Sequence, residues 1–382
     1  MQQHKIRLIS AGDISFQGRF SDNLSENPLN DVGPFFRSAD MVIANLESPF
    51  VDQSVDPVPG KCSLRGNKNW ATILKQSGVG LVTLANNHMM DFGDQGLLST
   101  IKALDDAGII HVGAGRNRQA ACSPIVIELS GKKMAFFGRS SVEVSSKCYA
   151  EDQSPGVAYL HEDELLDSIK EHRTTVDLIV VMLHWGIENY SYPSPSQRIL
   201  AKKIIEAGAD IILGHHPHVI QGEESIGNSL VSYSSGNFFF DEFVWSGLRS
   251  DGSETLYKLM LSRQNREGMM LHIDIHEDNG IKTRQTYTRI NEDATISIDL
   301  DTKRAKRYQS LCKKLHFASY DFLWKVYSLK REWDLRFRND MAFGKIIKKF
   351  YKIRPRHFKE FALKIRRSTR ISKGTSTNPY ED

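Results

Sequence analysis

The chain has 382 residues, of which 40% are hydrophobic and 25% are charged, and it contains 27 glycines. These values are typical of globular proteins, so they exclude a fibrous repeat and a largely disordered chain, and the length predicts two to three domains. The net charge of +4 is unevenly distributed: residues 1–300 carry 27 Lys and Arg against 38 Asp and Glu, whereas residues 301–382 carry 23 against 8. The sequence therefore predicts an acidic domain over 1–300 and a basic tail over 301–382.

Several absences predict a cytoplasmic location. The sequence has no run of 18 apolar residues, which a membrane-spanning helix would need. Its first residues lead directly into a short strand pattern, without the long apolar stretch of a secretory signal. The four cysteines are far apart and form no Cys-x-x-Cys pair, which favours reduced thiols over a disulfide framework or a zinc knuckle.

Short apolar runs alternate with helical patterns along the acidic domain. Strands are predicted at Ile6–Ala11, Met41–Ala44, Leu81–Leu84, Leu178–Leu183 and Ile211–Leu213. Helical spacing predicts a helix over Gly96–Ala107, and Ser194 is a typical N-cap for a second helix that ends at Ala207. Residues 255–300 alternate like strands that close the sheet, and residues 303–372 have basic, aromatic-rich helical patterns. This alternation indicates a layered α/β domain.

Polar residues follow five of the predicted strands within one to five residues of the strand end. They are Asp13, Glu47, Asn87 with His88, His184, and His216 with His218. Because ligands gather at the carboxyl ends of strands in open α/β sheets, we expect these side chains to lie at one edge. A mixed set of imidazole, carboxylate and amide groups favours divalent first-row ions, and a carboxylate between two ions is the usual arrangement in two-metal hydrolases.

Each of these blocks alone also has a structural interpretation. Gly12-Asp13 could form a simple turn, and the asparagines of Asn86-Asn87-His88 could cap a helix. His184, beside Trp185, could be a satisfied core histidine. Packing explains Gly214–His218 less well, because three imidazoles fall within four residues there. The five blocks together favour a metal centre.

Six motifs succeed one another along residues 5–245. They are Gly12-Asp13 with Gly18-Arg19, Asn45-Leu46-Glu47-Ser48-Pro49, Leu84-Ala85-Asn86-Asn87-His88 with Asp91 and Gly93, Leu183-His184-Trp185-Gly186, Gly214-His215-His216-Pro217-His218, and Tyr233-Ser234-Ser235-Gly236-Asn237-Phe238. Their order resembles the CapA family of capsule and poly-gamma-glutamate synthesis proteins, which are related to calcineurin-like metallophosphoesterases. The resemblance implies a four-layer α/β/β/α sandwich of metallophosphatase type, followed here by the basic helical tail.

The resemblance also implies a role for individual residues and two divalent ions (Mn, Fe or Zn) as cofactors. The implied ligands are Asp13 and His218 for one ion, Glu47 as the bridge, and Asn87, His184 and His216 for the second ion. His88 would be the general acid near the leaving group, with Asp91 orienting it. Arg19 and Asn237 are candidates for contact with an anionic substrate, and a structural role is the alternative for each.

Two positions depart from ordinary calcineurin-like enzymes. Those enzymes have a histidine two residues after the first aspartate, where this chain has Ser15. They also bridge the ions with aspartate, where this chain, like its CapA relatives, has Glu47. The first ion would therefore have fewer protein ligands, and hydrolase activity does not follow from the resemblance alone.

Three functions are open on this basis. The first is a dinuclear-metal hydrolase of phosphoester type that acts on an anionic or phosphorylated substrate in capsule, poly-gamma-glutamate or polysaccharide synthesis. The second is a non-catalytic accessory scaffold for an anionic polymer at the inner membrane face. There the basic tail, including Ile346–Ile353, would contact an anionic leaflet or envelope-biosynthesis proteins, unless it packs on the acidic domain. The third is a nucleic-acid phosphoesterase, the least favoured because no motif resembles a nucleic-acid module.

Overall fold

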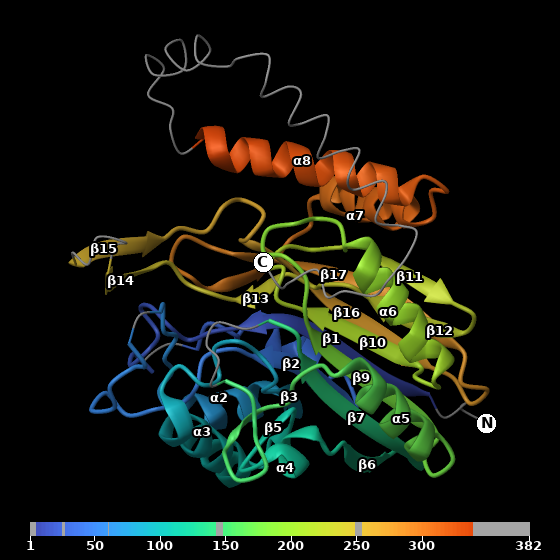
Figure 1. Cartoon of the computed structure of the whole chain (residues 1–382). Helices are drawn as coiled ribbons and strands as arrows, with labels where there is room; N and C mark the ends of the chain where they lie inside the picture. Colours follow the sequence, from blue (N-terminus) through green and yellow to red (C-terminus); the bar gives the residue numbers. More distant parts are fainter. Residues whose placement is uncertain (1–4, 25–26, 60, 143–147, 249–253, 339–382) are drawn as a thin grey trace. The chain divides into compact units, whose positions relative to one another are not determined.

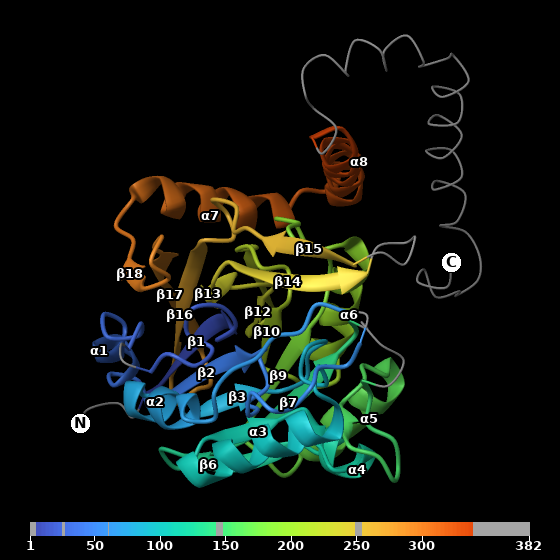
Figure 2. The ribbon, with the colours of Figure 1, turned by 90° about the vertical axis from the view of Figure 1, so that its left-hand side faces the viewer.

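The structure is a computed structural model, and it describes residues 5–24, 27–59, 61–142, 148–248 and 254–338. Two β-sheets face each other in its centre, and helices cover their outer faces (Figure 1, Figure 2). The chain divides into two compact units, Met1–Trp324 and Lys325–Asp382, and the sheets belong to the first. The domain boundary predicted after residue 300 stays a prediction.

The first sheet contains the N-terminal strand in its middle. Its strands are β1 (Ile6–Ile14), β2 (Met41–Leu46), β3 (Leu81–Thr83), β4 (Ile110–Val112), β13 (Asn237–Phe239), β16 (Glu267–Ile275), β17 (Ile281–Ile290) and β18 (Ile296–Ile298). Their order is β18-β17-β16-β1-β2-β3-β4, and β13 pairs with the end of β1. Strands β1 to β4 are parallel, so their carboxyl ends lie at the same edge.

The second sheet has the order β11-β12-β10-β9-β7-β6. Its strands are β6 (Ile125–Leu129), β7 (Lys132–Ser140), β9 (Leu178–His184), β10 (Ile211–His215), β11 (Glu223–Ile226) and β12 (Ser229–Ser232). Strands β7, β9, β10 and β12 are parallel. Two antiparallel pairs are separate from both sheets: β5 (Ala114–Gly115) with β8 (Gly156–Val157), and β14 (Phe243–Leu248) with β15 (Glu254–Leu259).

Alternating side chains divide the hydrophobic core into three layers. The helices are α1 (Gly33–Phe36), α2 (Trp70–Ser77), α3 (Gly93–Ala107), α4 (Arg118–Cys122), α5 (Glu162–Arg173), α6 (Pro195–Glu206), α7 (Thr302–Leu315) and α8 (Tyr320–Arg338). Along β1, Leu8 packs between the sheets, whereas Ile9 packs toward α2 and α3. In the second sheet Val180 packs between the sheets and Val181 packs toward α5 and α6. The four-layer α/β/β/α sandwich is therefore confirmed.

The predicted helices and strands are largely confirmed, with shifts at their ends. Helix α6 has the expected N-cap, since the Ser194 side chain accepts from the Gln197 backbone in a capping box. Helix α3 begins at Gly93, three residues before the predicted start. The prediction that β1 ends before a Gly12-Asp13 loop is wrong, because β1 continues to Ile14. Pairing with both β2 and β13 extends this strand, and a single sequence does not show that pairing.

The basic tail begins with helices, as predicted. Helix α7 packs on the sandwich through Tyr308 and Leu315, which are buried in its core layers, and Arg304 forms an ion pair with Glu267 of β16. Helix α8 follows. The predicted helical segments beyond Arg338, including Ile346–Ile353, lie outside the described residues. Among the described helices, none combines the length and the apolar character that crossing a bilayer needs.

Gly12 permits the close approach of β1 and β13 just before Asp13. A Cβ atom at this position would lie 1.8 Å from the carbonyl oxygen of Gly236. We expect Gly12→Ala to lower the free energy of unfolding by about 1–3 kcal/mol, as overpacked cores do, in urea denaturation. Gly33→Ala is the control, because its added Cβ meets only the Arg37 side chain. Equal losses in both variants would contradict this interpretation.

Candidate metal centre

The predicted ligands lie where the strand ends of the two sheets meet. Asp13 is on β1, Glu47 follows β2 and Asn87 lies four residues beyond β3, all in the first sheet. His184 ends β9 in the second sheet, and His216 and His218 follow β10. These six side chains are buried except His218, which is partly exposed. Parallel strands in both sheets therefore deliver polar groups from distant parts of the sequence to one edge.

Asp13, Glu47 and His218 form a compact group of possible metal ligands. Their ligand atoms all lie within 4.8 Å of one another. His218 Nδ1 is 3.4 Å from Asp13 Oδ2, and His218 Nε2 is 3.6 Å from Glu47 Oε1. Both carboxylate oxygens of Glu47 are buried and have no hydrogen-bond partner among the described residues. A buried carboxylate without donors is costly, and a cation would compensate it, so this donor set fits a metal ion.

Asn87, His184 and His216 lie together beside this group. Asn87 Oδ1 and His184 Nε2 are 2.8 Å apart, and the rings of His184 and His216 are centred 4.8 Å apart. Nδ1 of His216 is buried without a hydrogen-bond partner in the described part of the chain. The structure thus brings together all six residues predicted to hold metal.

The loop after β10 holds its histidines in an uncommon backbone conformation. His216 has φ 93° and His218 has φ 55°, both in the left-handed region that non-glycine residues rarely adopt. Such strain persists only where the surroundings enforce it, and it is frequent at functional sites. The conformation brings both imidazoles near Glu188, and the ligand atoms of these three residues lie within 4.8 Å of one another.

Sequence reasoning missed Glu188 and the part played by Asn45. Glu188 is exposed in the loop after β9. It lies five residues beyond the predicted strand end at Leu183, the same offset as His218 after Leu213, so that spacing could have found it. Asn45 is buried on β2, and its Nδ2 donates to Asp13 Oδ1 at 2.9 Å and lies 3.4 Å from His184 Nδ1. Its side-chain oxygen accepts from Asn86 Nδ2 at 3.1 Å. Asn45 was visible in the sequence only as part of the Asn45-Leu46-Glu47 motif.

Burial and charge give the ionisable groups of the centre different pKa values. Burial lowers the pKa of His216 to about 3 and that of His184 well below its usual value, so both imidazoles are neutral and can accept a metal ion. Burial raises the pKa of Glu47 to about 7. Burial opposes the charged form of His218, but Glu47 and Asp13 raise its pKa to about 9.

His88 and Asp91 are in contact, as the sequence predicted. His88 Nδ1 lies 2.8 Å from Asp91 Oδ2, across a turn that precedes α3. Asp91 is fully buried, and Lys61 Nζ is 2.6 Å from its other oxygen. The backbone N–H of Leu64 donates to Asp91 Oδ2 at 2.7 Å. Burial opposes the charge on His88, but Asp91 raises the pKa of the imidazole.

The two predicted substrate-binding residues have partners within the protein. Asn237 Oδ1 is 2.8 Å from His218 Nδ1, and its amide donates to the Asn265 carbonyl, so Asn237 orients His218. Arg19 Nε donates to Asp241 Oδ2 at 2.9 Å, and its side chain is partly exposed. Ser15 is buried, and its hydroxyl accepts from the backbone N–H of Gln17 at 3.3 Å.

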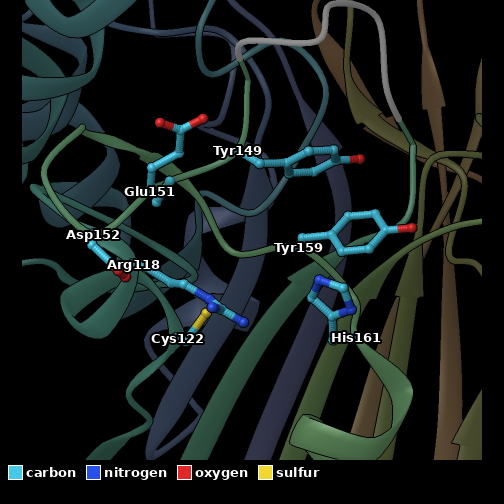
Figure 3. Close-up of a pocket in the computed structure, with 8 residues that line it drawn as sticks. Arg118, Cys122, Tyr149, Glu151, Asp152, Tyr159 and His161 are labelled. Carbon is cyan, nitrogen blue, oxygen red and sulfur yellow. The ribbon is translucent and has the colours of Figure 1, made fainter.

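A pocket of about 450 Å³ elsewhere in the structure contains none of the predicted site residues. Figure 3 shows Tyr149, Tyr159 and His161 along one wall, and Arg118 with Cys122 opposite them. Arg118 forms an ion pair with Glu164. The predicted chemistry is therefore associated with the strand ends and not with this pocket.

Two sheets between helices, with carboxylate, amide and imidazole groups at the strand ends, define a protein of the α/β/β/α sandwich class with a candidate metal centre. Similar solved structures include the NAD nucleotidase of Haemophilus influenzae (TM-score 0.41, 13% identity, 86% of this chain and 60% of that chain covered). A putative 5′-nucleotidase from Staphylococcus aureus has a TM-score of 0.44 at 13% identity, with 80% and 58% covered.

The chain belongs to the family of bacterial capsule synthesis proteins designated PGA_cap, whose model matches residues 7–242. The capsule biosynthesis protein CapA of Bacillus anthracis is 32% identical over 253 residues, which are 63% of this chain and 61% of that protein. The PGA biosynthesis protein CapA of Bacillus subtilis is 34% identical over 276 residues, 70% of each chain. A probable polyglutamine synthesis accessory protein of Mycobacterium tuberculosis is 30% identical over 182 residues, with 45% and 48% covered.

Metal binding should displace a proton from His218. Its raised pKa of about 9 keeps the metal-free imidazole protonated at pH 8, so metal binding at this pH should release about one proton. For the same reason the metal affinity should fall about tenfold per pH unit as the pH falls from 9 to 7. Below pH 7, protonation of Glu47 should weaken binding further. Calorimetry in buffers of different ionisation enthalpy measures the released protons, and His218→Gln should release fewer. An affinity that does not change with pH would contradict this prediction.

Proposed function

We propose that this protein is a dinuclear-metal hydrolase of phosphoester type that acts in the synthesis of a capsule, poly-gamma-glutamate or a related anionic polymer. The observation that carries the proposal is the buried carboxylate of Glu47, whose two oxygens have no donor while Asp13 and His218 lie beside it. Family membership supplies the biosynthetic context.

The proposed ligands are Asp13 and His218 for one ion, Glu47 as the bridge, and Asn87, His184 and His216 for the other. Two divalent ions there would lower the pKa of a water molecule and offset the negative charge of a phosphoryl group. Asn45 and Asn237 hold Asp13 and His218 in place through hydrogen bonds. Ser15 offers only a hydroxyl that already accepts a hydrogen bond, so the first ion has fewer protein ligands than in ordinary calcineurin-like enzymes.

His88 is the proposed general acid. Asp91 accepts from one ring nitrogen, which fixes the imidazole, and by raising the pKa of His88 it favours the protonated form that a general acid needs. Lys61 and the Leu64 backbone hold Asp91 from the opposite side. His88 is partly exposed, as a residue that meets substrate must be.

His216→Ala tests the centre directly. Removal of an outer partner of a metal ligand typically costs 10–100-fold in metal affinity, so loss of a ligand should cost at least about 100-fold in affinity and in phosphoester hydrolysis. Elemental analysis after incubation with manganese, iron or zinc measures occupancy. His161→Ala, in the separate pocket of Figure 3, is the control and should retain both metal occupancy and phosphoester hydrolysis. Unchanged occupancy and hydrolysis in His216→Ala would refute the site.

A second candidate function is a non-catalytic accessory role at the inner, anionic face of the cytoplasmic membrane, either for this protein alone or with envelope-biosynthesis proteins. Helix α8 favours it, because Phe322, Val326 and Trp333 are at least half exposed and follow helical spacing. Lys325 and Lys330 lie on the same helix, and residues 301–382 carry 23 basic against 8 acidic side chains. Exposed apolar side chains among cations are typical of helices that lie on anionic lipid.

The membrane role predicts binding to vesicles that contain phosphatidylglycerol but not to neutral vesicles. The double variant Phe322→Ser, Trp333→Ser should reduce the bound fraction several-fold in a sedimentation assay, because it removes two apolar anchors. This variant is preferable to deletion of residues 303–382, which would remove the buried side chains of α7. Val126→Ser, at an exposed apolar position on β6, is the control. Equal binding by all three proteins would argue against the role.

A further inference from the structure

A pocket of about 520 Å³ lies beside the general acid of the proposed centre. Its walls include Gln17 from the segment after β1, Lys61 and Arg65 from the segment between β2 and α2, Phe92 just before α3, and Trp245 from β14. The pocket thus combines cationic, amide and aromatic side chains, as small-molecule sites do, and its lining also includes one carboxylate, that of Asp22.

Lys61 connects this pocket to the candidate chemistry. Its Nζ is 2.6 Å from Asp91 Oδ1, and Asp91 Oδ2 is 2.8 Å from His88 Nδ1. The wall of the pocket is therefore two contacts away from the imidazole that would protonate a leaving group. A substrate whose phosphoryl group lies at the strand ends could extend its leaving group past His88 into this pocket.

Arg65 is held in place but has no carboxylate partner among the described residues. Its guanidinium donates from Nη2 to the Val55 carbonyl at 2.8 Å and lies 4.9 Å from the ring centre of Phe92. Its backbone N–H donates to Gln17 Oε1 at 2.8 Å. A guanidinium has five N–H groups, so most of those on Arg65 are available for a ligand. This preorganised fork suits carboxylate or phosphate oxygens.

Two other arginines that could be considered for anion binding, Arg19 and Arg118, each have a carboxylate partner. Arg19, which the sequence suggested for substrate contact, is paired with the buried carboxylate of Asp241. Arg118 in the pocket of Figure 3 is paired with Glu164. Arg65 therefore differs from both in lacking an internal anion, although it is only partly exposed.

We propose that this pocket binds an anionic group of the substrate, a carboxylate or a phosphate, on the leaving-group side of His88, and that Arg65 recognises it. The place of this group in the reaction rests on the proposed hydrolase function. Binding itself needs no metal, because the walls of the pocket contain none of the proposed metal ligands.

The experiment measures binding to the chelator-treated, full-length protein, so that the metal centre cannot capture the probe. The probes are a short glutamate oligomer, a glutamine oligomer of the same length and inorganic phosphate, each titrated by calorimetry. Arg65→Gln should weaken binding of the anionic probe about tenfold or more, as loss of a hydrogen bond to a charged group does. Arg118→Gln, in the pocket of Figure 3, is the control and should bind within about twofold of the unaltered protein, because its guanidinium is paired with Glu164 in an exposed ion pair far from this site.

A second variant keeps the proposal testable even if the Arg65→Gln protein does not fold. Gln53 is exposed at the same pocket, so Gln53→Glu adds a negative charge without disturbing packing and should weaken anion binding in a salt-sensitive way. Preference for the glutamate oligomer over its glutamine counterpart would identify a carboxylate, and preference for phosphate would identify a phosphate. Absence of anion binding, or equal loss in Arg65→Gln and Arg118→Gln, would overturn the proposal.

The two proposals can fail separately. If the metal-loaded protein hydrolyses no phosphoester but the metal-free protein binds the anion through Arg65, the pocket stands and the hydrolase function does not. If hydrolysis occurs and Arg65→Gln leaves KM unchanged for a substrate with an anionic leaving group, the pocket assignment is wrong and the metal centre stands. If both hold, Arg65→Gln should raise KM about tenfold while kcat changes little.

Discussion

The geometry of the candidate centre depends on the buried amide of Asn45. Its NH2 group binds Asp13 of the neighbouring strand and faces His184 of the opposite sheet, and its oxygen accepts from Asn86. No charged side chain could satisfy a carboxylate, an imidazole and another amide at once without adding a charge to the interior. A neutral group with two donors and an acceptor therefore joins the two sheets where the candidate ligands converge.

The chemistry of the centre could be predicted because it is local in sequence. Asp13, Glu47 and the histidines after β10 each lie close to the end of an apolar run, and that spacing is visible without coordinates. Glu188 meets the same spacing, since it lies five residues after the predicted strand end at Leu183. Arg65 could not be found in this way, because it is one of many charged residues in loops and differs from them only in its surroundings in three dimensions. Whether an arginine has a carboxylate partner depends on the fold and cannot be inferred from the residue type alone.

The fold class could be predicted from the sequence, but the number and the ends of the strands could be predicted less well. Strand β9 is buried on both faces and is a continuous apolar run, so its pattern is clear. Strand β7 begins with two lysines and includes Arg139. These charged residues interrupt the apolar pattern, so the sequence alone does not indicate a long strand there. The end of β1 was also missed, because its last residues are ordered by β13, more than 200 positions away, as the pairing of Asp13 with Asn237 illustrates. The intrinsic strand preference of the residues determines the ends of strands such as β1 only in part, because pairing with distant strands also contributes.

This pairing has a consequence for how the protein is made. Strand β1 is synthesised before both strands that flank it, β2 and β16, and β16 ends only at Ile275. Until β16 is made, the edge of β1 that pairs with it has no such partner, and Asp13 gains His216 and Asn237 only after the chain has passed those positions. Loop closure over such separations is slow and exposes strand edges to other chains. The candidate ligands therefore come together only late in the synthesis of residues 1–275, so protection of the nascent β1 edge should matter for folding.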